Sequence, residues 1–468
     1  MSVRLELDKA QKSFVDDATA IIRISNSQQV MASTNRMELP AFDSYAVAAF
    51  EAALPDGKYM FGAGAPSPEI LLDVQLLIKE ATAKRLEDTT RATRNIFQYG
   101  RKDGDPRFLI ALEKFLSERY GSGVDRRNLV ATSGASITLY FLLNELFPNR
   151  CTVFCEETSY MLALKWMRGL HYDVQSVPLQ CDGIDVDALE RSVQAAAAKA
   201  GDADGHGGYT AAVYLVPNFH NPTGCVLARE KCSRLIKLAR KYKLLIFCDD
   251  VYNFLNFDGD RALSERLFAY DKPSDADYVG SVVSIGSFSK ILSPGLRIGW
   301  AELPPVVKAK AWSDNPAIMS GGCPNMYMSG IVAQAFEMGL VDQLLEKSKR
   351  RIQMNLETLV QVFDRQLKPI GCTYEVPKGG FFLWVTLPEG MDSELVLAET
   401  YKREKLHFQT GAKFYTKSDP GSVARRQMRI SYSCIDTSQM EEAASKFANV
   451  IVDMHRNSVA KAAAPGTG

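Results

Sequence analysis

Apolar residues in the first two thirds of the chain follow two alternating patterns. Short runs of about four to six residues that are apolar on both faces alternate with longer segments of helical spacing. Fully apolar short strands separated by helices predict an α/β unit with a mainly parallel sheet covered by helices on both sides. The seven expected strands cover residues 128–132, 152–155, 172–177, 211–216, 244–248, 282–286 and 296–303. The helices expected between them cover residues 133–146, 159–170, 185–200 and 228–242.

The pattern changes after about residue 330. A long helical segment over 334–363 is interrupted only at Met338-Gly339. It is followed by strands expected at 374–377, 380–386 and 427–432 and by helices expected at 393–404 and 439–452. This pattern predicts a smaller α+β domain. We therefore expect an N-terminal helix and lid segment over 1–60 that belongs to the small domain, a large domain over 61–330, a small C-terminal domain over 331–456 and a disordered tail over 457–468.

Composition narrows the class of protein. The chain of 468 residues is 46% apolar and 24% charged, and its formal net charge is zero. We therefore expect no nucleic-acid partner, and because no apolar run has the length of a membrane span, we expect no membrane segment. Nine cysteines without a Cys-x-x-Cys pair, and acidic residues near the N-terminus, indicate a reduced, cytoplasmic setting. No metal site is expected.

A lysine turn follows the sixth expected strand. Lys290 lies in a short polar turn, with Ser287 three residues before it and Arg297 seven after it. A serine hydroxyl and an arginine are suited to an oxyanion such as a phosphate. A lysine amine beside a phosphate site suggests a Schiff base with pyridoxal 5′-phosphate (PLP). Taken alone, a bare Ser-x-x-Lys is more typical of a solvated loop lysine with a surface arginine, because such short matches arise often by chance.

Three further polar clusters follow expected strands. Ser133-Gly134-Ala135-Ser136 opens a helix whose free N–H groups suit an anion, although many helices simply begin with small polar caps. Tyr160 is placed to stack on an aromatic cofactor or to pack beside a helix start. Asn221 precedes Pro222, so its amide can point inward toward a phenolate oxygen or merely form a turn. His220 is interpreted as a structural loop residue.

Two charged positions complete the set. Asp249 ends a buried strand, where a carboxylate needs a partner such as a protonated pyridine nitrogen, and Tyr252 can reach the same ring. A helix-capping role is the alternative, and it fits Asp250 better than Asp249. Arg429 lies within an apolar strand, where its partner is either a substrate carboxylate or an internal protein carboxylate.

Together these residues resemble the fold type I, PLP-dependent class I/II aminotransferases, and most closely the 2-aminoadipate, kynurenine and aromatic aminotransferase subgroup. The similarity runs from about Phe61 to Tyr432. The motifs that carry it are Asn221-Pro222-Thr223-Gly224, Asp249-Asp250-Val251-Tyr252, Ser287-Phe288-Ser289-Lys290 with the segment 294–300, the segment 379–384, and Gln98-Tyr99-Gly100.

The resemblance implies a PLP-dependent transaminase and a role for each matching residue. Lys290 would form the internal aldimine, Asp249 would pair with the pyridine nitrogen, and Arg429 would bind the substrate α-carboxylate. The other implied contacts are Tyr252 and Asn221 with the ring oxygen, Tyr160 with the ring face, the N–H groups of Ala135 and Ser136 with Ser287 and Arg297 at the phosphate, Gly64 beside the substrate, and Tyr99 at the phosphate of a neighbouring subunit. A homodimer with shared active sites is therefore expected.

Two residues depart from the family pattern, and two other functions remain open. Thr158 stands where the family often has proline, and Ser136 stands where it often has glutamine. The same cofactor groups would serve a lyase or a cyclising synthase, which would be distinguished by its products. A PLP-sensing transcription regulator is the non-enzyme alternative, but the first 60 residues show no helix-turn-helix pattern. Substrates are expected to be an amino acid, in the aromatic, 2-aminoadipate-like or broad range, and a 2-oxo acid such as 2-oxoglutarate.

Overall fold

The computed structural model describes residues 59–88, 95–197, 208–259, 265–417 and 421–463. All of them belong to one compact unit, Ala52–Gly468. The N-terminal helix and lid segment predicted over 1–60 lie almost entirely outside the described residues. The division into a large and a small domain therefore stays a prediction, although two separate sheets are present.

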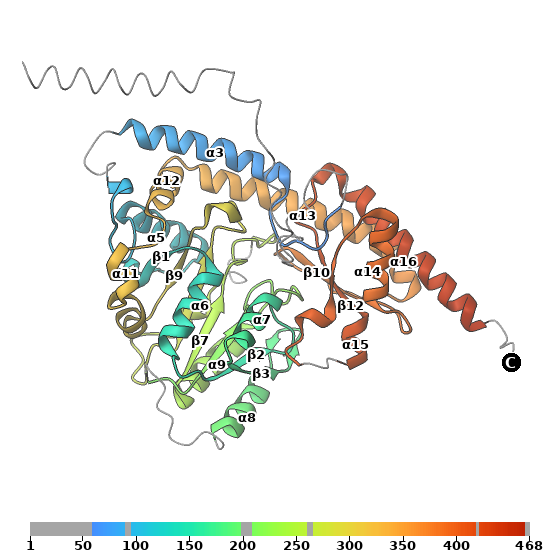
Figure 1. Cartoon of the computed structure of the whole chain (residues 1–468), viewed down its shortest axis with the longest axis horizontal. Coiled ribbons are helices and arrows are strands. Elements are labelled where there is room, and N and C mark those ends of the chain that lie inside the picture. Colours follow the sequence, from blue (N-terminus) through green and yellow to red (C-terminus); the bar gives the residue numbers. More distant parts are fainter. Residues whose placement is uncertain (1–58, 89–94, 198–207, 260–264, 418–420, 464–468) are drawn as a thin grey trace, which may run out of the picture. The chain divides into compact units, whose positions relative to one another are not determined.

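The larger sheet has seven strands in the order β1-β9-β8-β7-β6-β2-β3, which confirms the predicted α/β class (Figure 1). Only β9 runs antiparallel to its neighbours, β1 and β8. The strands are β1 (Leu129–Thr132), β2 (Thr152–Glu156), β3 (Asp173–Val177), β6 (Ala211–Leu215), β7 (Leu244–Asp249), β8 (Val282–Ser287) and β9 (Gly299–Glu302). A two-stranded hairpin, β4 (Leu179–Gln180) with β5 (Gly183–Ile184), follows β3.

Helices cover both faces of this sheet because successive strand residues point to opposite sides. Phe154, Val213 and Ile246 pack with the residues of α8 and α9 in one core cluster. The intervening side chains, such as Tyr214 and Phe247, belong to a second and larger cluster that includes α6. The helices of this part are α5 (Pro106–Tyr120), α6 (Ala135–Leu146), α7 (Met161–Gly169), α8 (Val186–Ala197) and α9 (Arg229–Tyr242).

The smaller sheet has three strands in the order β10-β12-β11. They are β10 (Phe382–Thr386), β11 (Gln409–Thr410) and β12 (Gln427–Ser431). The strand predicted at 374–377 is wrong, since that segment forms no strand, and the nearest pairing is an isolated bridge between Thr373 and Thr386. Pro377 at its end lacks the N–H that a strand needs. The two residues of β11 fill the third position instead.

The remaining helices precede β1 or follow β9 in the sequence. α13 and α14 both pack against α16, as Figure 1 shows. This set of helices consists of α3 (Pro68–Glu87), α10 (Pro305–Val307) with a π-helical turn (Lys308–Ser313), α11 (Pro316–Gly321), α12 (Met326–Glu337), α13 (Leu340–Gln366), α14 (Ser393–Glu404), α15 (Gly421–Arg426) and α16 (Met440–Ala463). The predicted interruption at Met338-Gly339 is confirmed, because it separates α12 from α13. Within the described part of the chain, no helix has the length and apolarity of a membrane span.

Two predicted boundaries need correction. The expected tail over 457–468 is helical as far as Ala463, because its first residues are alanine and other helix-compatible types with no glycine or proline before Pro465. The strand expected from residue 296 begins only at Gly299, because Pro294–Leu296 forms a 3-10 turn and Arg297 takes a left-handed conformation with φ 49°.

Candidate active site

The carboxyl ends of β6, β7 and β8 bring the predicted chemistry together. These strands are parallel neighbours, so the segments that follow them leave the sheet at the same edge. Asn221 follows β6, Asp249 ends β7, and Lys290 follows β8. Residues separated by about 70 positions in the sequence therefore meet over one edge of the sheet.

Lys290 points its amine into a partly buried region. Its Nζ donates to the carbonyl oxygen of Gly64 at 2.6 Å. Burial lowers the pKa of this amine to about 8, although the nearby Asp249 carboxylate acts in the opposite direction. A lysine with this pKa is partly neutral near physiological pH, so it is available as a nucleophile and as a base.

Asp249 presents one bonded and one free oxygen. The Tyr214 hydroxyl donates to Oδ2 at 2.8 Å, whereas the buried Oδ1 has no hydrogen-bond partner. Burial raises the pKa of Asp249 to about 6, and the hydrogen bond from Tyr214 and the charge of Lys290 oppose that rise. An unpartnered buried carboxylate oxygen is what a protonated ring nitrogen would satisfy.

Arg429, in the central strand of the smaller sheet, lies between two phenylalanine rings. Its guanidinium carbon is 4.0 Å from the ring centre of Phe382 and 4.9 Å from that of Phe414. It donates to Oδ1 of Asn221 at 2.9 Å and to the carbonyl of Gly62 at 2.6 Å, while its Nε has no partner. Among the residues that the structure describes, no carboxylate pairs with it, so the internal ion pair considered from the sequence is not found there.

Burial also affects the ionisation of Arg429. It lowers the pKa of Arg429 to about 10, because a buried charge is poorly solvated. Asn221 uses its other atom, Nδ2, to donate to the Tyr252 hydroxyl at 3.5 Å. Asn221 therefore links the arginine of the smaller sheet to the tyrosine that follows β7.

The predicted anion site lies where β1 turns into α6. Gly134 precedes α6 with φ 98°, and a side chain there would collide with the Arg297 guanidinium, 2.8 Å from the Cβ position. Arg297 donates to the carbonyl oxygens of Ser133 at 2.8 Å and Pro294 at 3.0 Å. The first N–H groups of α6, on Ala135 and Ser136, have no intrahelical acceptor, so this end suits a phosphate.

A small cavity connects the two ends of this site. Its lining residues are Ala135, Ser136, Leu139, Tyr160, Ala163, Trp166, Tyr214, Asp249 and Ile285. It contains Ala135 and Ser136 of the predicted phosphate end together with Asp249 and Tyr160. The residues present thus fit an aromatic ring that carries a phosphate and a ring nitrogen.

Gly64 and Tyr99 have different surroundings. A side chain at Gly64 would collide with the Phe382 ring, 2.4 Å from the Cβ position, so only glycine fits beside Lys290. Tyr99 is 80% exposed and lies outside this cluster. Ser287, at the end of β8, donates its hydroxyl to Ser289 at 2.9 Å.

Sequence reasoning missed Tyr214 and Phe414. Tyr214 is one polar group inside an apolar strand, and a buried tyrosine hydroxyl usually has a partner, which is the signal that was available. Phe414 carries no such signal. His220, interpreted from the sequence as a structural residue, is fully buried between Glu156 Oε2 at 3.1 Å and Thr223 Oγ1 at 2.9 Å.

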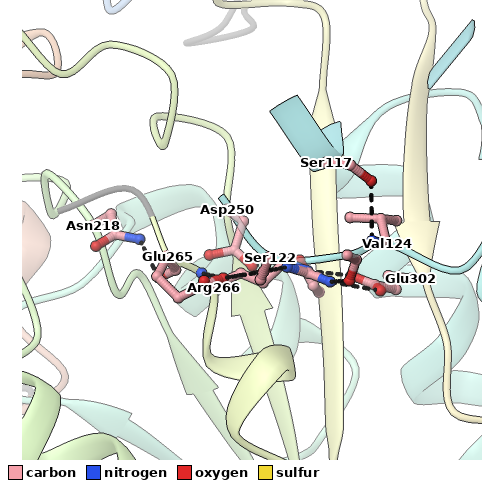
Figure 2. A network of polar contacts seen from close by, with 10 residues as sticks. Ser117, Ser122, Val124, Asn218, Asp250, Glu265, Arg266 and Glu302 are labelled. Carbon is pink, nitrogen blue, oxygen red and sulfur yellow. Dashed lines mark hydrogen bonds and ion pairs between the residues drawn. The ribbon is translucent and has the colours of Figure 1, made fainter. Parts of the chain in front are cut away.

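A second polar network is centred on Arg266 (Figure 2). Arg266 and Glu302 are both buried. The Arg266 guanidinium donates to both Glu302 carboxylate oxygens, from Nη2 at 3.0 Å and from Nε by a shorter contact. Arg266 Nη1 also donates to the Ser122 hydroxyl at 2.8 Å, and Asn218, in the loop before Asn221, donates to the Glu265 carbonyl at 3.3 Å. The network thus connects the Asn221 loop to β9.

The sequence profile of the class I and II aminotransferases matches residues 64–447, which is most of the chain. This chain belongs to that family. Its cofactor is pyridoxal 5′-phosphate, and the enzyme is a PLP-dependent transaminase.

Individual relatives of this aminotransferase are distant. It is 27% identical over 390 residues to the aromatic-amino-acid aminotransferase 1 of Thermococcus litoralis, covering 83% of this chain and 86% of the relative. It is 26% identical to the 2-aminoadipate transaminase of Thermus thermophilus, covering 84% and 90%. The crystal structure of the kynurenine aminotransferase of Pyrococcus horikoshii superimposes with a TM-score of 0.72 over 92% of this chain and 99% of that one, at 23% identity. These similarities confirm the predicted family and fold.

Proposed function

We propose that this aminotransferase moves the amino group of an L-amino acid to a 2-oxo acid such as 2-oxoglutarate, with the Lys290 amine joined covalently to the aldehyde carbon of PLP. Aromatic and 2-aminoadipate-like donors, or a broad range that includes both, are the proposed substrates, because the relatives in these two classes match most of the chain. The observation that supports this most is the meeting of a lysine amine of lowered pKa with a carboxylate whose second oxygen is free.

The bound PLP ring would withdraw electrons from the substrate Cα. Asp249 would hold the ring nitrogen protonated through its free Oδ1, and Tyr252 and Asn221 would bind the ring oxygen. Tyr160 would stack on the ring. The N–H groups of Ala135 and Ser136 would hold the phosphate, together with Ser287 and Arg297.

Arg429 and Lys290 would act on the substrate itself. The Arg429 side chain still has an unpartnered Nε, and the two phenylalanine rings fix its plane, so it can bind the α-carboxylate in one orientation. The Lys290 amine, which is partly neutral near physiological pH, would take the proton from the substrate Cα and hold it as an ammonium. Gly64 leaves room for the substrate and accepts a hydrogen bond from that amine.

We also propose a cytoplasmic homodimer with shared sites. Phe97 is 68% exposed, Tyr99 is 80% exposed, and the Phe97 ring centre lies 5.6 Å from that of the partly exposed Tyr327. An exposed group of aromatic side chains is typical of a surface that another chain covers. In such a dimer, Tyr99 of the partner subunit would reach the phosphate. The nine cysteines are all free, which supports a reducing compartment.

A donor panel tests the reaction. The purified protein, loaded with PLP, is given phenylalanine, tyrosine, kynurenine, 2-aminoadipate, aspartate or alanine with 2-oxoglutarate, and glutamate is measured. We expect glutamate from at least one large or acidic donor. Pyruvate and ammonia without any 2-oxo acid would instead identify a lyase.

Two lysine variants make the panel specific. Lys290→Ala should abolish glutamate formation. Lys308→Ala is the matched control, because its amine contacts the carbonyls of Arg127 and Leu129 and the carboxylate of Asp103, none of which belongs to the proposed site. This variant should keep the rate. A Lys290→Ala variant with a rate near that of wild type would refute the assignment.

A further inference from the structure

Tyr214 is the neighbour of Asp249 that the proposed mechanism does not yet use. It lies in β6 and pairs in register with Phe247 of β7, two residues before Asp249. Its ring is fully buried, and its hydroxyl donates to Asp249 Oδ2 at 2.8 Å. Within the described residues, it provides the only side-chain hydrogen bond to this carboxylate. The two carboxylate oxygens therefore differ, since one is bonded to the protein and the other is free.

We propose that Tyr214 is a positioning residue: it keeps Asp249 ionised and turned so that Oδ1 stays free for the ring nitrogen of PLP. The inference rests on the proposed pairing of Asp249 with that nitrogen. A strand residue packed on all sides cannot easily move, so its hydroxyl fixes the carboxylate rotation. Tyr214 and Asp249 also line the same cavity as Ser136 and Tyr160, so the hydrogen-bonded pair adjoins the space that the ring would occupy.

The chemistry of the pair supports a role in ionisation. Burial raises the pKa of Tyr214 well above 10, so the phenol remains a donor at every pH of interest. Burial also raises the pKa of Asp249 to about 6, and the Tyr214 hydrogen bond is the main contribution that holds it down. Without that donor, a buried carboxylate takes up a proton at higher pH. A neutral Asp249 cannot form an ion pair with a protonated ring nitrogen.

Other titratable groups act on Asp249 and would remain in a Tyr214 variant. Lys290 lowers its pKa, and Glu156 raises it. The remaining groups coupled to it by charge are Tyr160, Tyr252, Asp250 and Cys248. A change in pH dependence on replacing Tyr214 alone therefore reports the loss of its hydrogen bond.

The test measures cofactor affinity against pH. PLP is titrated into cofactor-free protein between about pH 5.5 and 9, and binding is followed by visible absorption. The variants are Tyr214→Phe and the control Tyr209→Phe. Tyr209 is equally buried, but its hydroxyl donates to the carbonyl of Gly280 at 2.6 Å and not to the site. The ionisable groups of free PLP also change with pH, but they do so identically in the experiments on all three proteins.

We expect the affinity of wild type to fall as Asp249 is protonated at low pH. In Tyr214→Phe the midpoint of this fall should move upward by about one pH unit, the size expected for a hydrogen bond to a charged group. Tyr209→Phe should keep the wild-type midpoint. An unchanged midpoint in Tyr214→Phe, or an equal loss of affinity at every pH, would show a merely structural residue.

Two further outcomes are separated by design. If Tyr214→Phe does not fold, difluorotyrosine at position 214 keeps the ring and strengthens the donor, so the midpoint should move downward; no movement overturns the proposal. If wild type itself binds no PLP, the proposed site fails, whereas binding by wild type with an identical midpoint in the variant refutes only the role of Tyr214.

Discussion

Replacing Arg266 with methionine should lower the thermal unfolding midpoint by roughly 5 °C. The guanidinium and the Glu302 carboxylate are each only 3% exposed. Arg266 also donates to Ser122, and its guanidinium carbon lies 4.7 Å from the ring centre of Tyr120. Removing it leaves the Glu302 carboxylate buried without its partner, which typically costs about 3–5 kcal/mol.

The size of the effect should depend on pH. Burial raises the pKa of Glu302, and Arg266 is the group that lowers it again. In Arg266→Met the folded-state pKa of Glu302 therefore moves further above its unfolded value. The folded state then binds more protons than the unfolded state between these two pKa values, so stability falls as pH rises through that range. We expect the deficit relative to wild type to be larger at pH 8 than at pH 5.

Two controls isolate the buried pair. In the double variant Arg266→Met with Glu302→Leu, the buried Glu302 carboxylate is removed as well, so most of the lost stability should return. The part that does not return includes the 3.2 Å pairing of Arg266 with Glu265. Arg127→Ala removes an arginine whose side chain is 89% exposed beside Asp125, and it should change the midpoint by less than about 1 °C. Scanning fluorimetry of all four proteins at both pH values is sufficient. If the single variant matches the double one at pH 8, or its deficit grows on acidification, the reasoning is wrong.

Three further predictions concern the site. In the cofactor-free protein, the rate at which Lys290 captures PLP should rise with pH up to about 8 and then level, because only the neutral amine reacts. The rate is measured by stopped-flow absorbance, and a rate independent of pH would contradict this. Asp249→Ala should still bind PLP at saturating concentration but lose most of the transamination rate, so undiminished turnover would count against its role. Arg429→Lys should raise KM for the amino acid roughly 10- to 100-fold in steady-state assays, since one ammonium replaces a bidentate guanidinium, and an unchanged KM would show that the carboxylate binds elsewhere.

The sequence alone determined the α/β sheet, the family and the individual candidate residues. Short apolar strands and helical spacing are local patterns, and the motifs around Asn221, Asp249 and Lys290 are each contained within a few residues. Parallel strands also leave one edge of a sheet together, so the meeting of these three loops followed from the order of elements. Local patterns were weaker at chain ends, where α16 continues to Ala463 instead of giving way to a tail.

Only the tertiary structure decided how the candidates are held. The hydrogen bond between Tyr214 and Asp249 depends on β6 lying beside β7, and the placing of Arg429 between Phe382 and Phe414 depends on three segments distant in the sequence. Whether a buried charged side chain has a protein partner depends on the residues that surround it in space and not on the residues next to it in the sequence. For that reason the sequence left the partner of Arg429 open, and the fold showed a guanidinium with no carboxylate beside it in the described part of the chain.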